Sequence, residues 1–156
     1  MRGDEPRCGG RGFDDGSGGG CEKIGGMTSP TYSDPLERLQ VYRLALDAMR
    51  DARTDAGTLW RDPLMREVSG QLVRAVASIA ANVAEGYSRG TTADRRKFLE
   101  YALGSARESL VWYETADLGP DRTLRIDRLV SIRRLLLTMI RTARASTSAD
   151  RQKFSR

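Results

Sequence analysis

Five polar side chains that can hydrogen-bond or titrate recur at helical spacing in the middle of the chain. They are Gln71, Arg74, Ser78, Asn82 and Glu85. At about 100° per residue they fall within a sector roughly 80° wide on one helix. A carboxylate and a hydroxyl could take part in proton transfer, but no base, metal ligand or activated nucleophile accompanies them. The pattern therefore favours a buried hydrogen-bond network that fixes helix packing, and a ligand site or a subunit interface is the alternative.

The chain contains no His, which removes Ser-His-Asp catalysis and imidazole metal ligands together. Its two cysteines, Cys8 and Cys21, form no CxxC pair, so the sequence predicts no metal site and no cofactor. Carboxylates at Asp47, Asp51 and Asp55 could serve a di-metal centre in a bundle, but such centres normally add Glu-x-x-His. We interpret these three as a solvated, salt-bridged helix face, and we expect no enzymatic activity.

Positive charge is concentrated near the end of the chain. Residues 121–156 contain ten basic and three acidic side chains, a balance of +7, whereas the whole chain carries +5. Arginine pairs bidentately with phosphate oxygens, and several such contacts give salt-sensitive binding to RNA or DNA backbone. The alternative is a solvated helix face that only aids solubility. The candidate nucleic-acid-binding residues are Arg133, Arg134, Arg141, Arg144, Arg151, Lys153 and Arg156.

Four stretches have the apolar periodicity of amphipathic helices, and none alternates in the manner of a strand. We expect helices at about 35–54, 63–87, 92–117 and 121–145. Start signals stand at Asp34–Pro35, Asp62–Pro63 and Thr91–Asp94. Gly57 and Thr58 should end the first helix. Short loops then predict an all-α, antiparallel up-down-up-down four-helix bundle.

The bundle should occupy residues 31–146, between two tails. Residues 1–30 contain ten of the 16 glycines and predict a disordered Gly-rich N-terminal tail, within which Met27 could be the true start of translation. Residues 147–156 predict a polar, basic C-terminal tail. No apolar run is long enough to span a membrane, so we expect a cytoplasmic protein without a membrane partner.

Two features of the expected helices indicate close packing beyond one core. Gly104 lies inside the third helix at a cost of about 1 kcal/mol relative to Ala, which suggests that a neighbouring helix approaches it closely. The apolar faces are wide, and Val130 and Leu137 lie among the arginines of the fourth helix. Wide faces leave apolar area over once a monomer core is filled, which favours a homo-oligomer.

Two segments carry a family resemblance, QLVRAVASIAANVAEGYSR at 71–89 and FLEYALGSARESL at 98–110. They resemble the four-helix bundle protein family, also called the 23S rRNA intervening-sequence protein family, to which accessory proteins of diversity-generating retroelements are related. The matched motif positions are Gln71, Arg74, Ser78, Asn82, Glu85, Gly86, Arg89, Gly104, Ser105 and Glu108.

The resemblance implies a cytoplasmic bundle that can assemble as a ring-like pentamer. For the retroelement branch it implies nucleic acid and a reverse transcriptase as partners. Together with the charge distribution, it predicts a non-enzymatic, oligomeric protein that binds nucleic acid or serves as a ribonucleoprotein accessory module. A protein–protein assembly module without a nucleic-acid role is the alternative.

Overall fold

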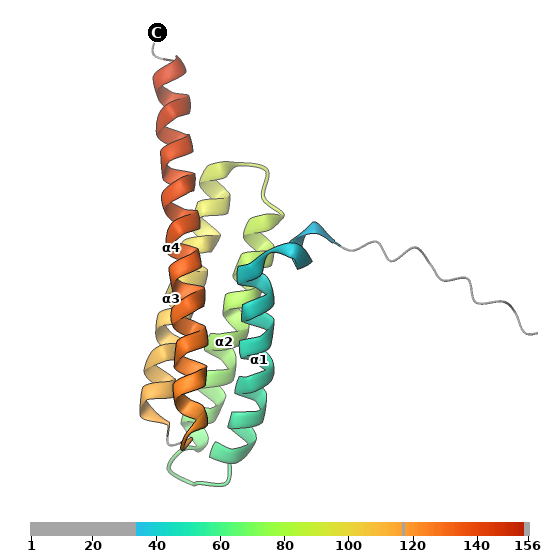
Figure 1. Cartoon of the computed structure of the whole chain (residues 1–156), viewed down its shortest axis with the longest axis vertical. Helices are drawn as coiled ribbons and strands as arrows, with labels where there is room; N and C mark the ends of the chain where they lie inside the picture. The colour runs from blue at the N-terminus through green and yellow to red at the C-terminus, as the bar shows by residue number, and fades with distance from the viewer. Residues whose placement is uncertain (1–33, 117, 155–156) are drawn as a thin grey trace, which may run out of the picture. The chain divides into compact units, whose positions relative to one another are not determined.

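The computed structural model describes residues 34–116 and 118–154. Its elements are the 3-10 turn η1 (Pro35–Arg38) and the helices α1 (Gln40–Leu59), α2 (Arg66–Tyr87), α3 (Thr92–Thr115) and α4 (Asp121–Phe154). Each helix packs against the next, and α4 closes the bundle against α1 (Figure 1). The predicted all-α, up-down-up-down bundle is therefore confirmed. The expectations for residues 1–30 and for Met27 lie outside the described residues.

The first helix begins and ends later than its sequence signals indicate. Asp34 caps η1 instead of α1, because its side chain accepts a hydrogen bond of 2.9 Å from the Leu36 amide. Leu39 is extended (φ −69°, ψ 119°) and separates the two elements. Gly57 lies within α1 and does not break it, since the helix continues to Leu59.

The later boundaries follow local hydrogen bonds. Asp62 Oδ1 accepts from the Leu64 amide at 2.9 Å, which makes a turn before α2 instead of its first residues. Thr91 caps α3 as predicted, because its Oγ1 accepts from the Asp94 amide at 3.0 Å. Gly119 has φ +58°, the left-handed conformation that glycine adopts readily, and it lies between α3 and α4.

The fourth helix is longer than the sequence predicts. It continues to Phe154 instead of ending near residue 145, so most of the expected C-terminal tail is helical. Figure 1 shows α4 extending past the turn between α2 and α3. No Gly or Pro follows Pro120. Once a helix is nucleated, each further residue adds one hydrogen bond, and the sequence offers nothing that stops this extension.

The core contains side chains from all four helices. Alanines supply much of the inner face of α1, and larger residues supply those of α2, α3 and α4. The fully buried large side chains include Leu72, Ile79, Val83, Tyr113, Leu129, Ile132 and Leu136. Leu64 and Leu124 are 83% and 54% exposed, because each lies at or before the first turn of its helix.

Glycine marks the closest approach of α2 and α3. A Cβ added at Gly86 would lie 3.0 Å from the Phe98 Cβ and 3.2 Å from the Arg95 carbonyl oxygen. Gly104, where we expected such an approach, has nothing within 4 Å of the same position. The expectation for Gly104 is therefore wrong for packing within the chain.

Candidate nucleic-acid interface

The predicted arginines of α4 lie on its outer side. Arg134, Arg141 and Arg144 are exposed and Arg133 is half-buried. Arg144 Nη2 donates a hydrogen bond of 2.9 Å to Glu100 Oε1 on α3. Val130 and Leu137, which lie among them in sequence, are half-buried, and Leu137 packs against the core. This part of α4 therefore presents cations without a wide apolar strip between them.

The structure describes less of the remaining three predicted contact residues than of the four arginines above. Arg151 and Lys153 lie on the last turns of α4, and their side chains are outside the described part of the structure. Arg156 follows the last described residue. The structure therefore adds only the helical backbone at two of these positions.

The α2–α3 turn brings further cations to the same end of the bundle. Arg89 follows α2, and the run Arg95, Arg96 and Lys97 belongs to the first turns of α3. Arg96 Nε lies 3.8 Å from Glu100 Oε1, the same oxygen that accepts from Arg144. The sequence prediction included Arg89 only as a motif position and none of these residues as a nucleic-acid contact, because residues 27–120 contain 12 basic and 13 acidic side chains. The RRK run at 95–97 was the signal that could have found them.

A groove of about 330 Å³ lies between the start of α3 and the second half of α4. Its lining combines hydroxyl groups, one guanidinium and an apolar floor: Thr92, Arg95, Leu99, Thr138, Met139, Thr142, Ala143 and Ser146. Arg95 Nη2 donates to the Arg89 carbonyl at 3.4 Å, so the guanidinium is held at this end of the bundle. The hydroxyls of Thr138, Thr142 and Ser146 donate to carbonyls of α4 itself, so the groove places the donors of Thr92 and Arg95 beside that helix.

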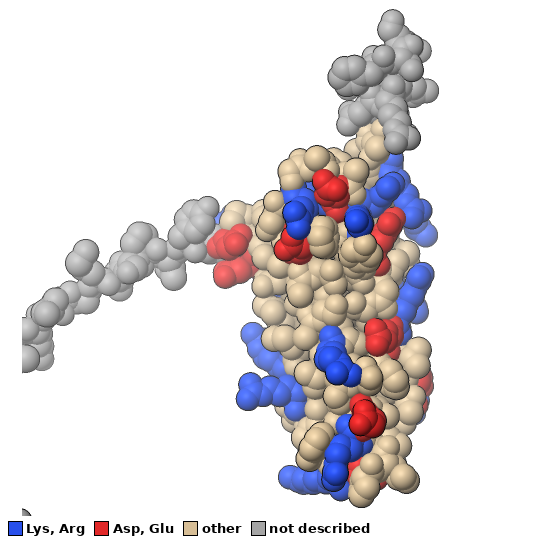
Figure 2. Space-filling view, turned by 180° about the vertical axis from the view of Figure 1, so that it is seen from behind, with Lys and Arg blue, Asp and Glu red and all other residues tan. Residues whose placement is uncertain are grey.

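Figure 2 shows how charge is distributed on one face of the molecule. Basic side chains gather near the end at which α4 extends from the bundle, and acidic side chains stand among them. The Glu100 pairs described above are one such mixture. The interface is therefore a set of separate cations around a groove, and not one uniform basic surface.

The polar stripe of α2 is only partly a network. Asn82 Nδ2 donates to the Ser78 carbonyl at 2.8 Å and to Ser78 Oγ at 3.0 Å. Ser105 Oγ on α3 donates to Ser78 Oγ at 3.1 Å, which ties the two helices together. Both Ser78 and Asn82 are half-buried. This part of the stripe acts in packing, as the burial argument predicts.

The rest of the stripe faces outward, which corrects the prediction of a continuous buried network. Arg74 and Glu85 are exposed, and Gln71 is half-buried. Glu85 pairs with Arg89 on the surface of the same helix. Glu108, also exposed, accepts from Trp112 Nε1 at 3.3 Å. An outward-facing polar stripe needs no internal partners, since water can satisfy its groups.

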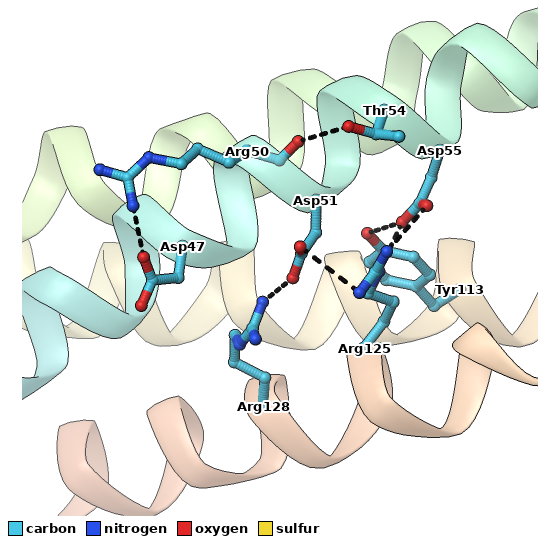
Figure 3. A network of polar contacts seen from close by, with 8 residues as sticks. All are labelled: Asp47, Arg50, Asp51, Thr54, Asp55, Tyr113, Arg125 and Arg128. Atoms are coloured by element: carbon cyan, nitrogen blue, oxygen red, sulfur yellow. Dashed lines mark hydrogen bonds and ion pairs between the residues drawn. The ribbon is translucent and has the colours of Figure 1, made fainter.

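The buried polar cluster lies elsewhere, between α1, α3 and α4 (Figure 3). Asp55 is 5% exposed. It accepts from the Tyr113 hydroxyl at 2.9 Å and from Arg125 Nε at 3.0 Å. Asp51 pairs with Arg125 at 3.4 Å and also with Arg128. Our interpretation of Asp51 and Asp55 as a solvated face is therefore wrong.

Asp47 differs from its two neighbours, because it pairs with Arg50 at 2.5 Å on the exposed side of α1. Helical spacing cannot separate these carboxylates without knowing which helices flank α1. The partners of Asp55 come from residues 58 and 70 positions away in sequence, so no local pattern reveals them.

The electrostatics of this cluster keep Tyr113 and Arg125 in their ordinary charge states. Burial raises the pKa of the Tyr113 hydroxyl, and the nearby Asp55 carboxylate raises it further. The hydrogen bond to Asp55 raises the pKa of the Arg125 guanidinium, and burial opposes that effect. Tyr113 thus stays a neutral donor and Arg125 a cation at neutral pH. Such a cluster can hold helices in register, and neither Tyr113 nor Arg125 exchanges protons near pH 7.

Comparison with known proteins identifies the architecture. The family model described as 23S rRNA-intervening sequence protein matches residues 37–118. A crystal structure of a protein with unknown function from Bacteroides thetaiotaomicron, described as from the S23 ribosomal protein family, has a TM-score of 0.60 and 24% identity. The similarity covers 64% of this chain and 97% of that chain, and at this identity it shows the fold alone. No curated protein matches the chain.

Proposed function

Since the chain belongs to the 23S rRNA-intervening sequence protein family, we propose that it is a non-enzymatic protein that binds the phosphate backbone of RNA or DNA. The observation that carries the proposal is the convergence of cations from two parts of the sequence. Arg89, Arg95, Arg96 and Lys97 come from the α2–α3 turn and the start of α3, and they share one end of the bundle with Arg144 of α4.

The chemistry of this end suits phosphate oxygens. Guanidinium groups offer paired donors, and the Thr92 hydroxyl in the groove can donate to the same oxygens, whereas the hydroxyls of Thr142 and Ser146 already donate to carbonyls of α4. Glu100 neutralises part of the charge, so the contacts are individually weak. Contacts to phosphate fix position without reading bases, and we therefore expect binding largely independent of sequence.

A fluorescence anisotropy titration with labelled RNA and DNA at two salt concentrations tests the proposal. Affinity should fall steeply with salt, since each neutralised phosphate releases about 0.7–0.9 of a counterion. Changing Arg133, Arg134, Arg141 and Arg144 together to Gln should remove most of the affinity. The matched control changes four exposed arginines elsewhere, Arg38, Arg43, Arg50 and Arg107.

The control variant has the same net charge as the test variant, so a specific interface predicts a much larger loss in the test variant. Equal losses would reduce the effect to general electrostatics. No binding by the wild type, even at low salt, would favour the assembly-module alternative.

That alternative rests on exposed apolar side chains that a monomer leaves uncovered. Outside the loop that follows α1, large hydrophobic residues are exposed at Tyr87, Tyr101, Val111 and Leu124. We propose a homo-oligomer, with a pentamer as the first choice, and light scattering at micromolar concentration tests it against a monomer of 17.3 kDa.

A cytoplasmic location, and a reverse transcriptase partner if the gene is linked to a retroelement, belong to the same proposal. Among the described residues, no helix has the length and apolar character needed to cross a membrane.

A further inference from the structure

The end of α1 lies at the opposite end of the bundle from the end at which α4 extends (Figure 1), and the residue that follows it, Trp60, has an exposed aromatic side chain. Trp60 is 58% exposed. A buried indole would gain several kcal/mol from the hydrophobic effect, about 25 cal/mol per Å² of apolar surface. Because Trp60 remains exposed, the chain does not gain this stabilisation, and the ring is accessible to another molecule.

One arginine contacts this ring, and two more lie close to Trp60 along the chain. The Arg66 guanidinium carbon lies 5.0 Å from the ring centroid, a cation–π contact. Arg61 is the next residue, and Arg53 lies seven residues earlier, on the same side of α1. Gly57 stands between Arg53 and Trp60 on that side, and nothing lies within 4 Å of its Cβ position. The surface beside Gly57 is therefore open, while Arg66 lies over one face of the indole.

These arginines are free to bind an outside anion. Among the described residues, none of the three forms an ion pair. The two acidic residues of the segment are engaged: Asp62 accepts from the Leu64 amide, and Asp55 is buried with Arg125.

We propose that Trp60, with Arg53, Arg61 and Arg66, binds an unpaired base and the flanking phosphates of a single-stranded polynucleotide. The indole offers a stacking face, and stacking on an aromatic ring tolerates any base because each base has a π face. The arginines supply the contacts to the backbone on either side of that base. Bases inside a duplex are already stacked and cannot reach the ring, so duplexes should not use this site.

This inference rests on the proposed nucleic-acid function but concerns a second site with a different ligand. Charge complementarity favours a polyanion over a second copy of the chain, because a second copy would bring the same unpaired arginines to the contact. An apolar protein partner would use Leu64, which is 83% exposed in the same loop, as much as Trp60. The experiment separates these occupants.

Intrinsic fluorescence reports directly on the indole. The chain has two Trp residues, so Trp112→Phe leaves Trp60 as the single emitter. That variant is titrated at low salt with a single-stranded oligouridylate and oligodeoxyadenylate, and with an RNA duplex and a DNA duplex of the same length. Stacking should quench the emission with the single strands, and the duplexes should leave it unchanged. Should Trp112→Phe fold poorly, the difference in emission between wild type and Trp60→Phe gives the same signal.

Affinity measurements provide the second readout. Trp60→Ala should weaken binding of single strands roughly 5- to 150-fold and leave duplex binding unchanged. Leu64→Ala is the matched control from the same loop and should have no effect on either. Trp60→Phe should retain part of the single-strand affinity, because a smaller ring still stacks.

The other possible results distinguish failure of the Trp60 site from failure of the proposed nucleic-acid function. Equal loss in Leu64→Ala and Trp60→Ala, or a change of mass in light scattering for Trp60→Ala, would assign the site to a protein contact and overturn the inference. Duplex binding without any effect at Trp60 would overturn it and leave the proposed function intact. Quenching by single strands that persists when the four α4 arginines are changed would support Trp60 as a site that binds independently of the α4 interface. No binding of any probe would reject both.

Discussion

The Tyr113 hydroxyl donates a hydrogen bond of 2.9 Å to Asp55 Oδ2, joining α3 to α1 across 58 residues of sequence. Arg125 of α4 donates to the same carboxylate at 3.0 Å. One buried carboxylate therefore connects three of the four helices. The geometry makes this cluster the most specific polar contact between helices that are distant in the chain, and its removal should be felt by the whole bundle.

Replacing Asp55 by Ala should destabilise the protein by about 3–5 kcal/mol, because it leaves the mostly buried Arg125 guanidinium without its main partner. The control is Asp47→Ala, which removes an exposed pair with Arg50 and should cost about 0–1 kcal/mol. Urea unfolding followed by circular dichroism measures both. Similar losses for the two variants would show that burial of the Asp55 cluster does not matter to stability.

Tyr113 should make stability depend on alkaline pH. Burial, reinforced by Asp55, raises the pKa of the Tyr113 hydroxyl above the ordinary value of about 10. The contribution to stability from this raised pKa is fully present below about pH 10 and is lost as pH rises beyond it, because the unfolded chain ionises first.

Above pH 10, the free energy of unfolding should fall more steeply for the wild type than for Tyr113→Phe, by up to about 1.4 kcal/mol per pH unit. Below pH 10 the two curves should be parallel. Urea titrations at several pH values measure the slopes, and parallel curves across the whole range would contradict the assignment.

Two glycines should respond to Ala substitution with opposite signs. Gly86→Ala puts a methyl group 3.0 Å from the Phe98 Cβ, which should cost about 1–3 kcal/mol as α2 and α3 are forced apart. Gly104→Ala meets open space within a helix and should stabilise the chain by about 0.5–1 kcal/mol. Thermal melts compare the two. If Gly104→Ala instead lowers the mass of an assembly, the close approach predicted from the sequence occurs between subunits.

The polar stripe should divide into a part that packs and a part that does not. Asn82→Leu removes the donor to half-buried Ser78 and leaves that hydroxyl with fewer partners, so a cost of about 1–3 kcal/mol is expected. Glu85→Ala removes only a surface pair with Arg89 and should cost about 0.3–0.5 kcal/mol. Chemical denaturation measures both, and a larger loss for Glu85→Ala would show that an assembly buries this residue.

The fold could be predicted from the sequence because its signals are local. Apolar periodicity identified four helices, and the Thr91–Asp94 cap marked the start of α3. The boundaries that were wrong have local causes too, such as the Asp62 turn before α2. What could not be predicted depends on three-dimensional neighbours. Nothing near Asp55 in sequence indicates that Tyr113 and Arg125 will meet it.

The candidate interfaces divide in the same way. Charge counting found the arginines of α4, but it did not reveal that Arg96 and Arg144 share Glu100. Trp60 belongs to no sequence motif, and its exposure could not be predicted because it depends on which helices of the folded bundle pack over it.

The buried polar cluster between α1, α3 and α4 also affects the C-terminal half of α4. Arg125 and Arg128 hold one side of this helix against Asp51 on α1, which fixes the rotational setting of the helix about its own axis. A slip of one residue turns a helix by about 100° and would carry Arg141 away from its present outward direction. The pairs of Asp51 with Arg125 and Arg128 thus help to set the direction in which the arginines of the later turns of α4 point. In the described part of the chain, those arginines, such as Arg141, form no ion pair with Asp51 themselves.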